Sequence, residues 1–266
     1  MAPIASAITR VLITGFGPFQ GVPNNPSWGI ASRLPQTLPN DIELIVYPNA
    51  IPVAYHPVIE TIPPLIEDVQ PDISLHIGVA EGRTYFAVEQ TSRKNVYSSI
   101  EDIDGEVFTN AEGDQYWSDQ PAQIGTDLNL PAVVARWQNR TADIVWPDSA
   151  SLNNELRANA VVPSSPIEVA LREDVLKVET SDVHSLEGDD VRWSDNVGVY
   201  LCGFIYYTSM VEMSRETVGQ RRDTAFMHVP MLSSEEELDM GVAITTELVQ
   251  SLVETWRAQR EGEDAS

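Results

Sequence analysis

The chain has 266 residues, of which 42% are hydrophobic and 21% are charged, so it is long enough to bury a sizeable core and is expected to be a soluble globular protein. Its 40 acidic and 16 basic residues give a formal net charge of −24, which argues against nucleic acid and anionic membranes as partners. No apolar stretch approaches the roughly 20 residues of a membrane span, and residues 1–7 lack the basic start of a signal peptide. With a single cysteine and no internal disulfide pair, the protein is expected in a reducing cytoplasm.

The first part of the chain alternates short apolar runs with segments of helical pattern. Strands are predicted at residues 11–14, 42–47 and 73–77. Asn25 followed by Pro26 is a helix-start signal, and a second helix is predicted over residues 55–69, where Pro63-Pro64 should kink or interrupt it. Strands that alternate with helices at short intervals predict an α/β fold, with an open, mostly parallel twisted sheet and helices on both faces.

The rest of the chain is less regular. Residues 93–127 are rich in acids, Gly and Ser and are predicted to form long loops, whereas residues 130–140 are predicted to be helical. Residues 147–192 hold several acids and prolines and are interpreted as an insertion. The last helix is predicted to open with a capping box at Ser234-Glu235-Glu236-Glu237, and residues 260–266 are predicted to form a disordered tail.

A glycine-rich turn follows the first predicted strand, in the segment Gly15-Phe16-Gly17-Pro18-Phe19-Gln20-Gly21. It does not fit a dinucleotide-binding turn, because the third glycine comes four residues after the second and Pro18 removes a backbone donor that a phosphate would need. Phe16 and Phe19 suit an apolar slot at the carboxyl end of a strand, where open α/β sheets bind their ligands. The alternative, in which both rings only plug the end of the sheet, fits the sequence equally well.

The single cysteine, Cys202, is either an inert buried thiol or a nucleophile that is paired with a base. Composition alone favours the inert thiol, because free cysteine is among the most buried residue types. However, Cys202 lies at the start of an apolar segment of helical pattern. There the helix dipole would lower the thiol pKa, and the backbone N–H of the cysteine could donate to an oxyanion.

Four histidines compete for the role of the base. His228 ends a predicted strand and is best placed; His56 precedes Pro57 at a helix start, His76 lies within a strand as an expected core histidine, and His184 lies in the acidic insertion. Glu89 is the best-placed acid to orient the imidazole of His228, although it is also readable as one solvated glutamate among many.

Five segments in order resemble the pyroglutamyl-peptidase I (pyrrolidone carboxyl peptidase) family of cysteine peptidases. They are Thr14-Gly15-Phe16-Gly17-Pro18-Phe19; Asn25-Pro26-Ser27-Trp28; His76-Ile77-Gly78-Val79; Tyr200-Leu201-Cys202 with Phe204 and Tyr206-Tyr207-Thr208-Ser209; and Ala225-Phe226-Met227-His228-Val229-Pro230. In addition, Glu89 follows Arg83 by the interval at which the family carries its catalytic glutamate. The sequence around the cysteine looks more like that of eukaryotic members than that of bacterial ones.

The resemblance implies a single three-layer α/β/α sandwich over residues 1–266 that removes N-terminal pyroglutamyl residues from peptides without a metal or cofactor. It implies Cys202 as nucleophile, His228 as general base and acid, and Glu89 as the orienting residue. For the substrate pocket it implies Phe16, Phe19, Asn25, Tyr200 and Leu201. The expected partners are small peptides with N-terminal pyroglutamate; the oligomeric state stays open, with a monomer favoured.

The chain departs from the bacterial members at three positions. Val107 stands where they carry an arginine that helps to hold the oxyanion, Val79 stands for a glutamine, and Gly203 for a polar residue. Loss of one oxyanion donor can cost ~100-fold in rate. The sequence therefore also admits a weakly active or inactive homologue that acts as a binding protein on the same fold.

Overall fold

The computed structural model describes residues 8–145, 147, 191–217 and 219–264. The strands are β1 (Thr9–Gly15), β2 (Thr37–Leu38), β3 (Ile42–Val46), β4 (Ile73–Val79), β5 (Phe86–Glu89), β6 (Thr91–Arg93), β7 (Gln123–Gly125), β8 (Val191–Ser194) and β9 (Thr224–Val229). The helices are α1 (Pro26–Ala31), α2 (Tyr55–Val69), α3 (Asn110–Tyr116), α4 (Leu130–Thr141), α7 (Leu201–Glu216) and α8 (Glu235–Asp264).

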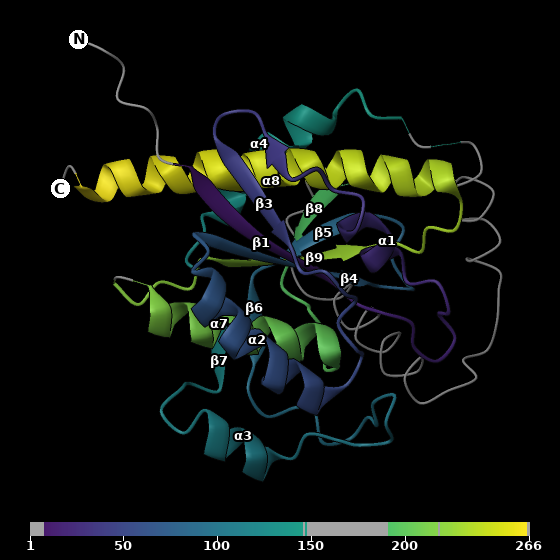
Figure 1. The fold of residues 1–266 in the computed structure, drawn as a ribbon, viewed down its shortest axis with the longest axis vertical. Coiled ribbons are helices and arrows are strands. Elements are labelled where there is room, and N and C mark those ends of the chain that lie inside the picture. Colours follow the sequence, from purple (N-terminus) through teal and green to yellow (C-terminus); the bar gives the residue numbers. More distant parts are fainter. Residues whose placement is uncertain (1–7, 146, 148–190, 218, 265–266) are drawn as a thin grey trace.

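The described strands form a seven-stranded mixed sheet in the order β2-β3-β1-β4-β9-β5-β8 and a separate two-stranded pair, β6-β7. The central strands β3, β1, β4 and β9 run parallel to one another. Strand β5 pairs antiparallel with β9, and β8 pairs parallel with β5 at the edge of the sheet. Figure 1 shows α1, α4 and α8 on one face of the sheet, and α2 and α7 on the other. The predicted α/β fold, with a mostly parallel sheet between helical layers, is confirmed.

Alternation along the strands produces one hydrophobic core on each face of the sheet, because successive side chains of a strand point to opposite faces. In β1, Val11 and Ile13 pack into the core under α8, whereas Leu12 packs into the aromatic core under α2 and α7. The whole of β4 is buried, as expected for a central parallel strand that is covered on both faces.

Pro63-Pro64 do not interrupt the helix, since α2 runs from Tyr55 to Val69 with both prolines inside it, while the alternative of a kink stays a prediction. The two prolines remove the N–H donors to the carbonyls of Ile59 and Glu60, but Pro64 itself is exposed and Pro63 is half-buried. The opposite face of α2 is fully buried through Val58, Ile62 and Ile66, and this burial holds the helix together.

Two predicted irregular segments are also more ordered than expected. Residues 93–127 contain α3 and β7 as well as loops, and α3 opens with a capping box between Thr109 and Glu112. The predicted tail is helical as far as Asp264, because Arg221 binds Glu263 (2.6 Å) and Gln259 donates to the carbonyl of Asp127 (3.1 Å). Residues 265–266 lie outside the described residues.

The other predicted elements can be compared directly with the structure. The strands at 11–14, 42–47 and 73–77, the helix at 130–140 and the two helix starts at Asn25 and Ser234 are confirmed. Most of the predicted insertion lies outside the described residues, but its last two residues, Val191 and Arg192, begin β8 and therefore belong to the sheet. Among the helices of the described ranges, none is both long and apolar enough to cross a membrane.

Candidate active site

Cys202 and His228 lie next to each other at the carboxyl ends of the central strands. Gly78 of β4 is the register partner of His228 of β9, and neighbouring strands run about 4.8 Å apart. The Sγ of Cys202 sits over Gly78, because a Cβ atom placed on Gly78 would come within 2.9 Å of it. The structure therefore brings the thiol to the strand position beside the histidine.

Cys202 is the second residue of α7, and the fold fixes this position tightly. Tyr200 is the N-cap in an extended conformation, and the first intrahelical bond runs from the N–H of Phe204 to the carbonyl of Tyr200 (3.1 Å). The N–H groups of the first helical turn, including that of Cys202, have no carbonyl partner within the helix. They can thus donate to an anion that forms next to the thiol.

His228 and Glu89 form a buried pair with a defined proton position. The Nδ1 atom of His228 lies 2.8 Å from Oε1 of Glu89, and the two side chains are 5% and 0% exposed. An ionised carboxylate can only accept, so Nδ1 carries the proton and donates it to Glu89. The other ring nitrogen, Nε2, is then free of a proton and can act as a base.

Arg83 completes this cluster, and the sequence interpretation gave it no role. Its Nη1 donates to Oε1 of Glu89 (2.6 Å) and lies 3.3 Å from Nδ1 of His228; its Nη2 donates to the carbonyl of Asn196 (2.6 Å). The backbone N–H of Asn196 donates to Oε2 of Glu89 (2.9 Å), which closes a ring of hydrogen bonds. The signal was present in the sequence as an arginine six residues before a candidate catalytic acid.

The electrostatics of the cluster favour a neutral thiol and a neutral imidazole. Burial raises the pKa of the Cys202 thiol to about 12, with a further rise from Glu89 that Arg83 opposes. Burial also lowers the pKa of His228, and the charge of Arg83 lowers it further. Arg83 and the hydrogen bond from His228 hold the pKa of Glu89 well below its usual range, against the effect of burial.

This result differs from the expectation that the helix dipole lowers the pKa of the thiol. Cys202 is only half-buried as a residue, but its thiol is packed against the aromatic core and the buried Glu89 carboxylate lies nearby. Desolvation of the thiolate outweighs the dipole at this position. The arrangement therefore suits proton transfer from thiol to imidazole during attack, rather than a preformed ion pair.

Four of the five predicted pocket residues belong to, or pack against, the same hydrophobic cluster as Cys202. Phe16, Tyr200 and Leu201 are buried members of one hydrophobic cluster, against which Phe19 and Cys202 pack. Asn25 is already engaged within the protein, since its Nδ2 donates to the carbonyl of Gly17 (2.8 Å) and its Oδ1 accepts from the N–H and the hydroxyl of Ser27. Asn25 thus shapes the turn that carries the two phenylalanines.

The remaining histidines do not reach the thiol in the described residues. His56 pairs with Glu106 (2.7 Å) and Glu112 (3.0 Å) at the start of α2. His76 is fully buried; its Nδ1 is bonded to the hydroxyl of Thr14 (2.7 Å), its Nε2 has no partner within the described ranges, and burial lowers its pKa to about 3. The fourth histidine, His184, lies outside the described residues.

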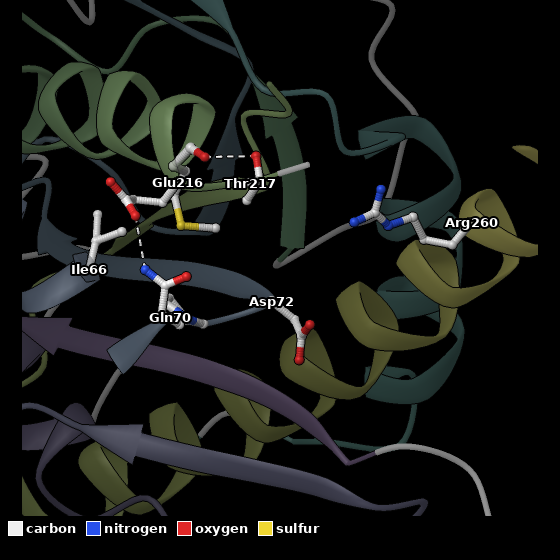
Figure 2. A pocket seen from close by; sticks show the side chains of 8 residues that line it. Ile66, Gln70, Asp72, Glu216, Thr217 and Arg260 are labelled. Carbon is white, nitrogen blue, oxygen red and sulfur yellow. Dashed lines mark hydrogen bonds between the residues drawn. The ribbon is translucent and has the colours of Figure 1, made fainter. Parts of the chain in front are cut away.

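Two cavities lie at different distances from this arrangement. A cavity of about 580 Å³ adjoins the turn after β1 and the segment after β9, lined by Gly17, Asn25, Trp28, Met231 and Leu238 among others. A smaller one of about 190 Å³ lies at the other end of α7, where Figure 2 shows Gln70 and Glu216 hydrogen-bonded to each other. It is separated from Cys202 by the length of the helix, roughly 20 Å. The described residues hold no cluster of three His, Cys, Asp or Glu side chains suited to a metal ion.

Comparison with known proteins identifies the family of the chain. A family model described as "Pyroglutamyl peptidase" matches residues 9–150, which is more than half of the chain and includes Phe16, Phe19, Asn25 and Glu89. Similar curated proteins include the pyrrolidone-carboxylate peptidase of Thermococcus onnurineus, 28% identical over 86% of this chain and 87% of the relative. Pyroglutamyl-peptidase 1 of Mus musculus is 26% identical over 86% of this chain and 82% of the relative.

Solved structures show the same fold. A pyrrolidone carboxyl peptidase of Pyrococcus furiosus superimposes with a TM-score of 0.64 at 18% identity, over 93% of this chain and 100% of the other. The pyroglutamyl peptidase I of Bacillus amyloliquefaciens gives a TM-score of 0.63 at 21% identity, over 92% and 96%. Archaeal, bacterial and mammalian relatives are about equally similar to this chain, so the comparisons show no clear preference for eukaryotic members.

Proposed function

Because the chain belongs to the pyroglutamyl peptidase family, we propose that it hydrolyses the bond after an N-terminal pyroglutamyl residue of peptides, with Cys202 as nucleophile. One observation carries the proposal: the thiol of Cys202 lies over Gly78, the register partner of a histidine whose Nδ1 donates to a buried glutamate. A nucleophile, a base and a group that orients the base are the parts that covalent acyl transfer needs.

The reaction begins with attack of the thiol on the carbonyl of the pyroglutamyl residue. Nε2 of His228 takes the Cys202 proton as sulfur bonds to the carbonyl carbon, and the oxyanion receives the backbone N–H of Cys202. Glu89 stabilises the imidazolium through Nδ1. The imidazolium then gives its proton to the leaving amine, the C–N bond breaks, and a thioacyl-enzyme remains.

Water completes the cycle. His228 takes a proton from water, the oxygen attacks the thioacyl carbon, and the C–S bond breaks. The proton returns from the imidazolium to the sulfur, so pyroglutamate leaves and the thiol is restored. The neutral thiol and imidazole of the resting site are the starting and ending states of this cycle.

The pocket chemistry supports a neutral ring as the recognised group. Phe16 and Phe19, with Tyr200 and Leu201 beside them, offer an apolar surface, and the amide of Asn25 is already bonded within the turn. A lactam ring can enter such a site, whereas a charged amino terminus would lose its hydration without a partner. Specificity for a blocked N-terminus follows from this difference.

The test is hydrolysis of a fluorogenic pyroglutamyl amide by the wild-type protein and by the variants Cys202→Ala, His228→Ala and Glu89→Gln. We expect Cys202→Ala and His228→Ala to lose about 10,000-fold or more in rate. His56→Gln is a matched control, because His56 also pairs with glutamates but lies elsewhere, and it should keep the wild-type rate.

Two results would count against the proposal. A folded wild-type protein without thiol-dependent turnover would favour a binding protein on this fold, which is the second interpretation of the sequence. Equal rates for the wild type and Cys202→Ala would remove Cys202 from the mechanism.

We propose in addition that residues 1–266 form one domain of a cytoplasmic protein, with a monomer favoured.

A further inference from the structure

Arg83 is a buried cation that touches both members of the His228–Glu89 pair. Its side chain is 5% exposed, and it lies 2.6 Å from Glu89 Oε1 and 3.3 Å from His228 Nδ1. Because Nδ1 already donates to Glu89, it cannot accept from Arg83, so the guanidinium acts on the imidazole through its charge and not through a hydrogen bond. A positive charge at this distance opposes protonation of the ring.

We propose that Arg83 is a positioning residue of the site, which locks Glu89 against His228 and keeps the imidazole neutral in the resting enzyme. The inference rests on the proposed peptidase function, which it deepens by assigning the state of the general base.

The first part of the role is geometric. Glu89 accepts at Oε1 from Arg83 and His228, and at Oε2 from the backbone of Asn196, while the second guanidinium nitrogen of Arg83 holds the carbonyl of Asn196. Asn196 belongs to the segment that leads into α7 and so to Cys202. The planar fork of arginine holds a carboxylate and a carbonyl at once in fixed directions, whereas the ammonium of lysine sits on a flexible stem and does not fix them.

The second part of the role is electrostatic. An unpaired Glu89 carboxylate in this buried site would draw a proton onto His228, because an adjacent opposite charge favours the protonated imidazole. Arg83 neutralises Glu89, so the carboxylate orients the ring without charging it. The lowered pKa of His228, with burial and Arg83 as its two causes, agrees with this balance.

The experiment compares wild type, Arg83→Met and Arg83→Lys by two readouts. Histidine-labelled NMR follows the titration of His228, whose signal is identified by its loss in His228→Gln, and kcat/KM is measured against pH with a pyroglutamyl amide. In Arg83→Met, we expect the titration of His228 and the acid limb of kcat/KM to move together to higher pH. The rate on the plateau should fall by about 100-fold, because the base is no longer held in place.

Arg83→Lys separates the two parts of the role, since it keeps a charge and removes the fork. Its His228 titration should stay near that of the wild type, while the plateau of kcat/KM falls by about tenfold. Arg221→Met is the matched control: Arg221 forms a bidentate pair with the buried Asp223, ahead of β9 at its opposite end. It should leave both the titration and the acid limb unchanged.

Several outcomes would overturn the proposal. A loss of rate in Arg83→Met without any shift in the His228 titration would show that Arg83 has a merely structural role. If both the His228 titration and the pH profile of kcat/KM of Arg83→Met matched the wild type, Arg83 would have no role in the site. If circular dichroism shows that Arg83→Met does not fold, the test rests on Arg83→Lys. A wild-type rate for Arg83→Lys would then contradict the proposal. If no protein, wild type included, hydrolyses the amide, the peptidase function fails, whereas the NMR titration still tests Arg83.

Discussion

Two glycines allow Cys202 and the start of α7 to pack closely against their neighbours. A Cβ atom on Gly78 would lie 2.7 Å from Cζ of Phe226 and 2.9 Å from Sγ of Cys202. A Cβ atom on Gly203 would lie 2.6 Å from the carbonyl oxygen of Gly198 and 3.1 Å from the hydroxyl of Tyr97. The glycine after the cysteine, where bacterial members carry a polar residue, is therefore required by the packing of α7 in this chain.

Gly78→Ala should displace the thiol and reduce both stability and activity. The added methyl overlaps with Phe226 and Cys202, and overpacking of this kind typically costs about 1–3 kcal/mol. Because catalysis depends on the position of the sulfur to within about 1 Å, kcat/KM should fall by about 100-fold. The measurements are urea denaturation and hydrolysis of a pyroglutamyl amide.

Gly262→Ala is the matched control for that substitution, since a Cβ atom at Gly262 meets nothing within 4 Å. It should keep full activity and lose no stability, because alanine favours a helix over glycine. If Gly78→Ala retained wild-type activity, the position inferred for the thiol over Gly78 would be wrong.

At the scale of elements, His56 connects the start of α2 to the segment around α3 through two ion pairs. Its Nδ1 lies 2.7 Å from Glu106, and its Nε2 lies 3.0 Å from Glu112, which is also the acid of the α3 capping box. The hydrogen bond to Glu112 raises the pKa of His56, against a smaller effect of burial. The hydroxyl of Thr109 and His56 lower the pKa of Glu112 to about 2.

His56→Gln should lower stability in a window of acidic pH. The raised pKa of His56 means that its contribution is fully present below its unfolded pKa of about 6.5 and is lost as the pH rises through the higher folded value. Glu112 contributes above its unfolded pKa of about 4.3, and this part is lost as the pH falls towards its folded value. Between these limits, we expect a loss of about 0.5–1 kcal/mol, because the pair is partly exposed and screened.

Urea denaturation at pH 5.5 and at pH 9 measures this difference between wild type and His56→Gln. At pH 9 the two proteins should converge, since the imidazole is neutral in both states of the wild type. A constant difference across the whole range would mean that packing of the ring, and not its charge, stabilises the segment.

Local signals made part of the fold and of the candidate site predictable from the sequence. Asn25-Pro26 and Ser234–Glu237 start helices with contacts inside a few residues, and they were identified correctly. The role of Arg83 was missed because one of its partners, His228, lies 145 residues away. The helical end of α8 was missed for a similar reason, because Arg221 and Asp127 anchor it from distant segments.

At the scale of the whole molecule, acids exceed basic residues by 40 to 16, and several of the described arginines are engaged in ion pairs. The resulting negative potential acts on every charged substrate that approaches the site. The cluster of Arg83, Glu89 and His228 is itself buried, so it is screened little by salt, whereas the approach of the substrate is screened strongly.

Peptides with a basic residue after the pyroglutamyl group should therefore be cleaved faster than acidic ones at low ionic strength. We expect kcat/KM for a pyroglutamyl-lysyl peptide to exceed that of the matched glutamyl peptide by about tenfold at ~10 mM salt. The ratio should fall towards one at ~0.5 M salt, where the Debye length is only about 4–5 Å. A neutral alanyl peptide is the control and should change little with salt. A ratio that does not respond to salt would place the selectivity in direct contacts at the site instead of the charge of the whole chain.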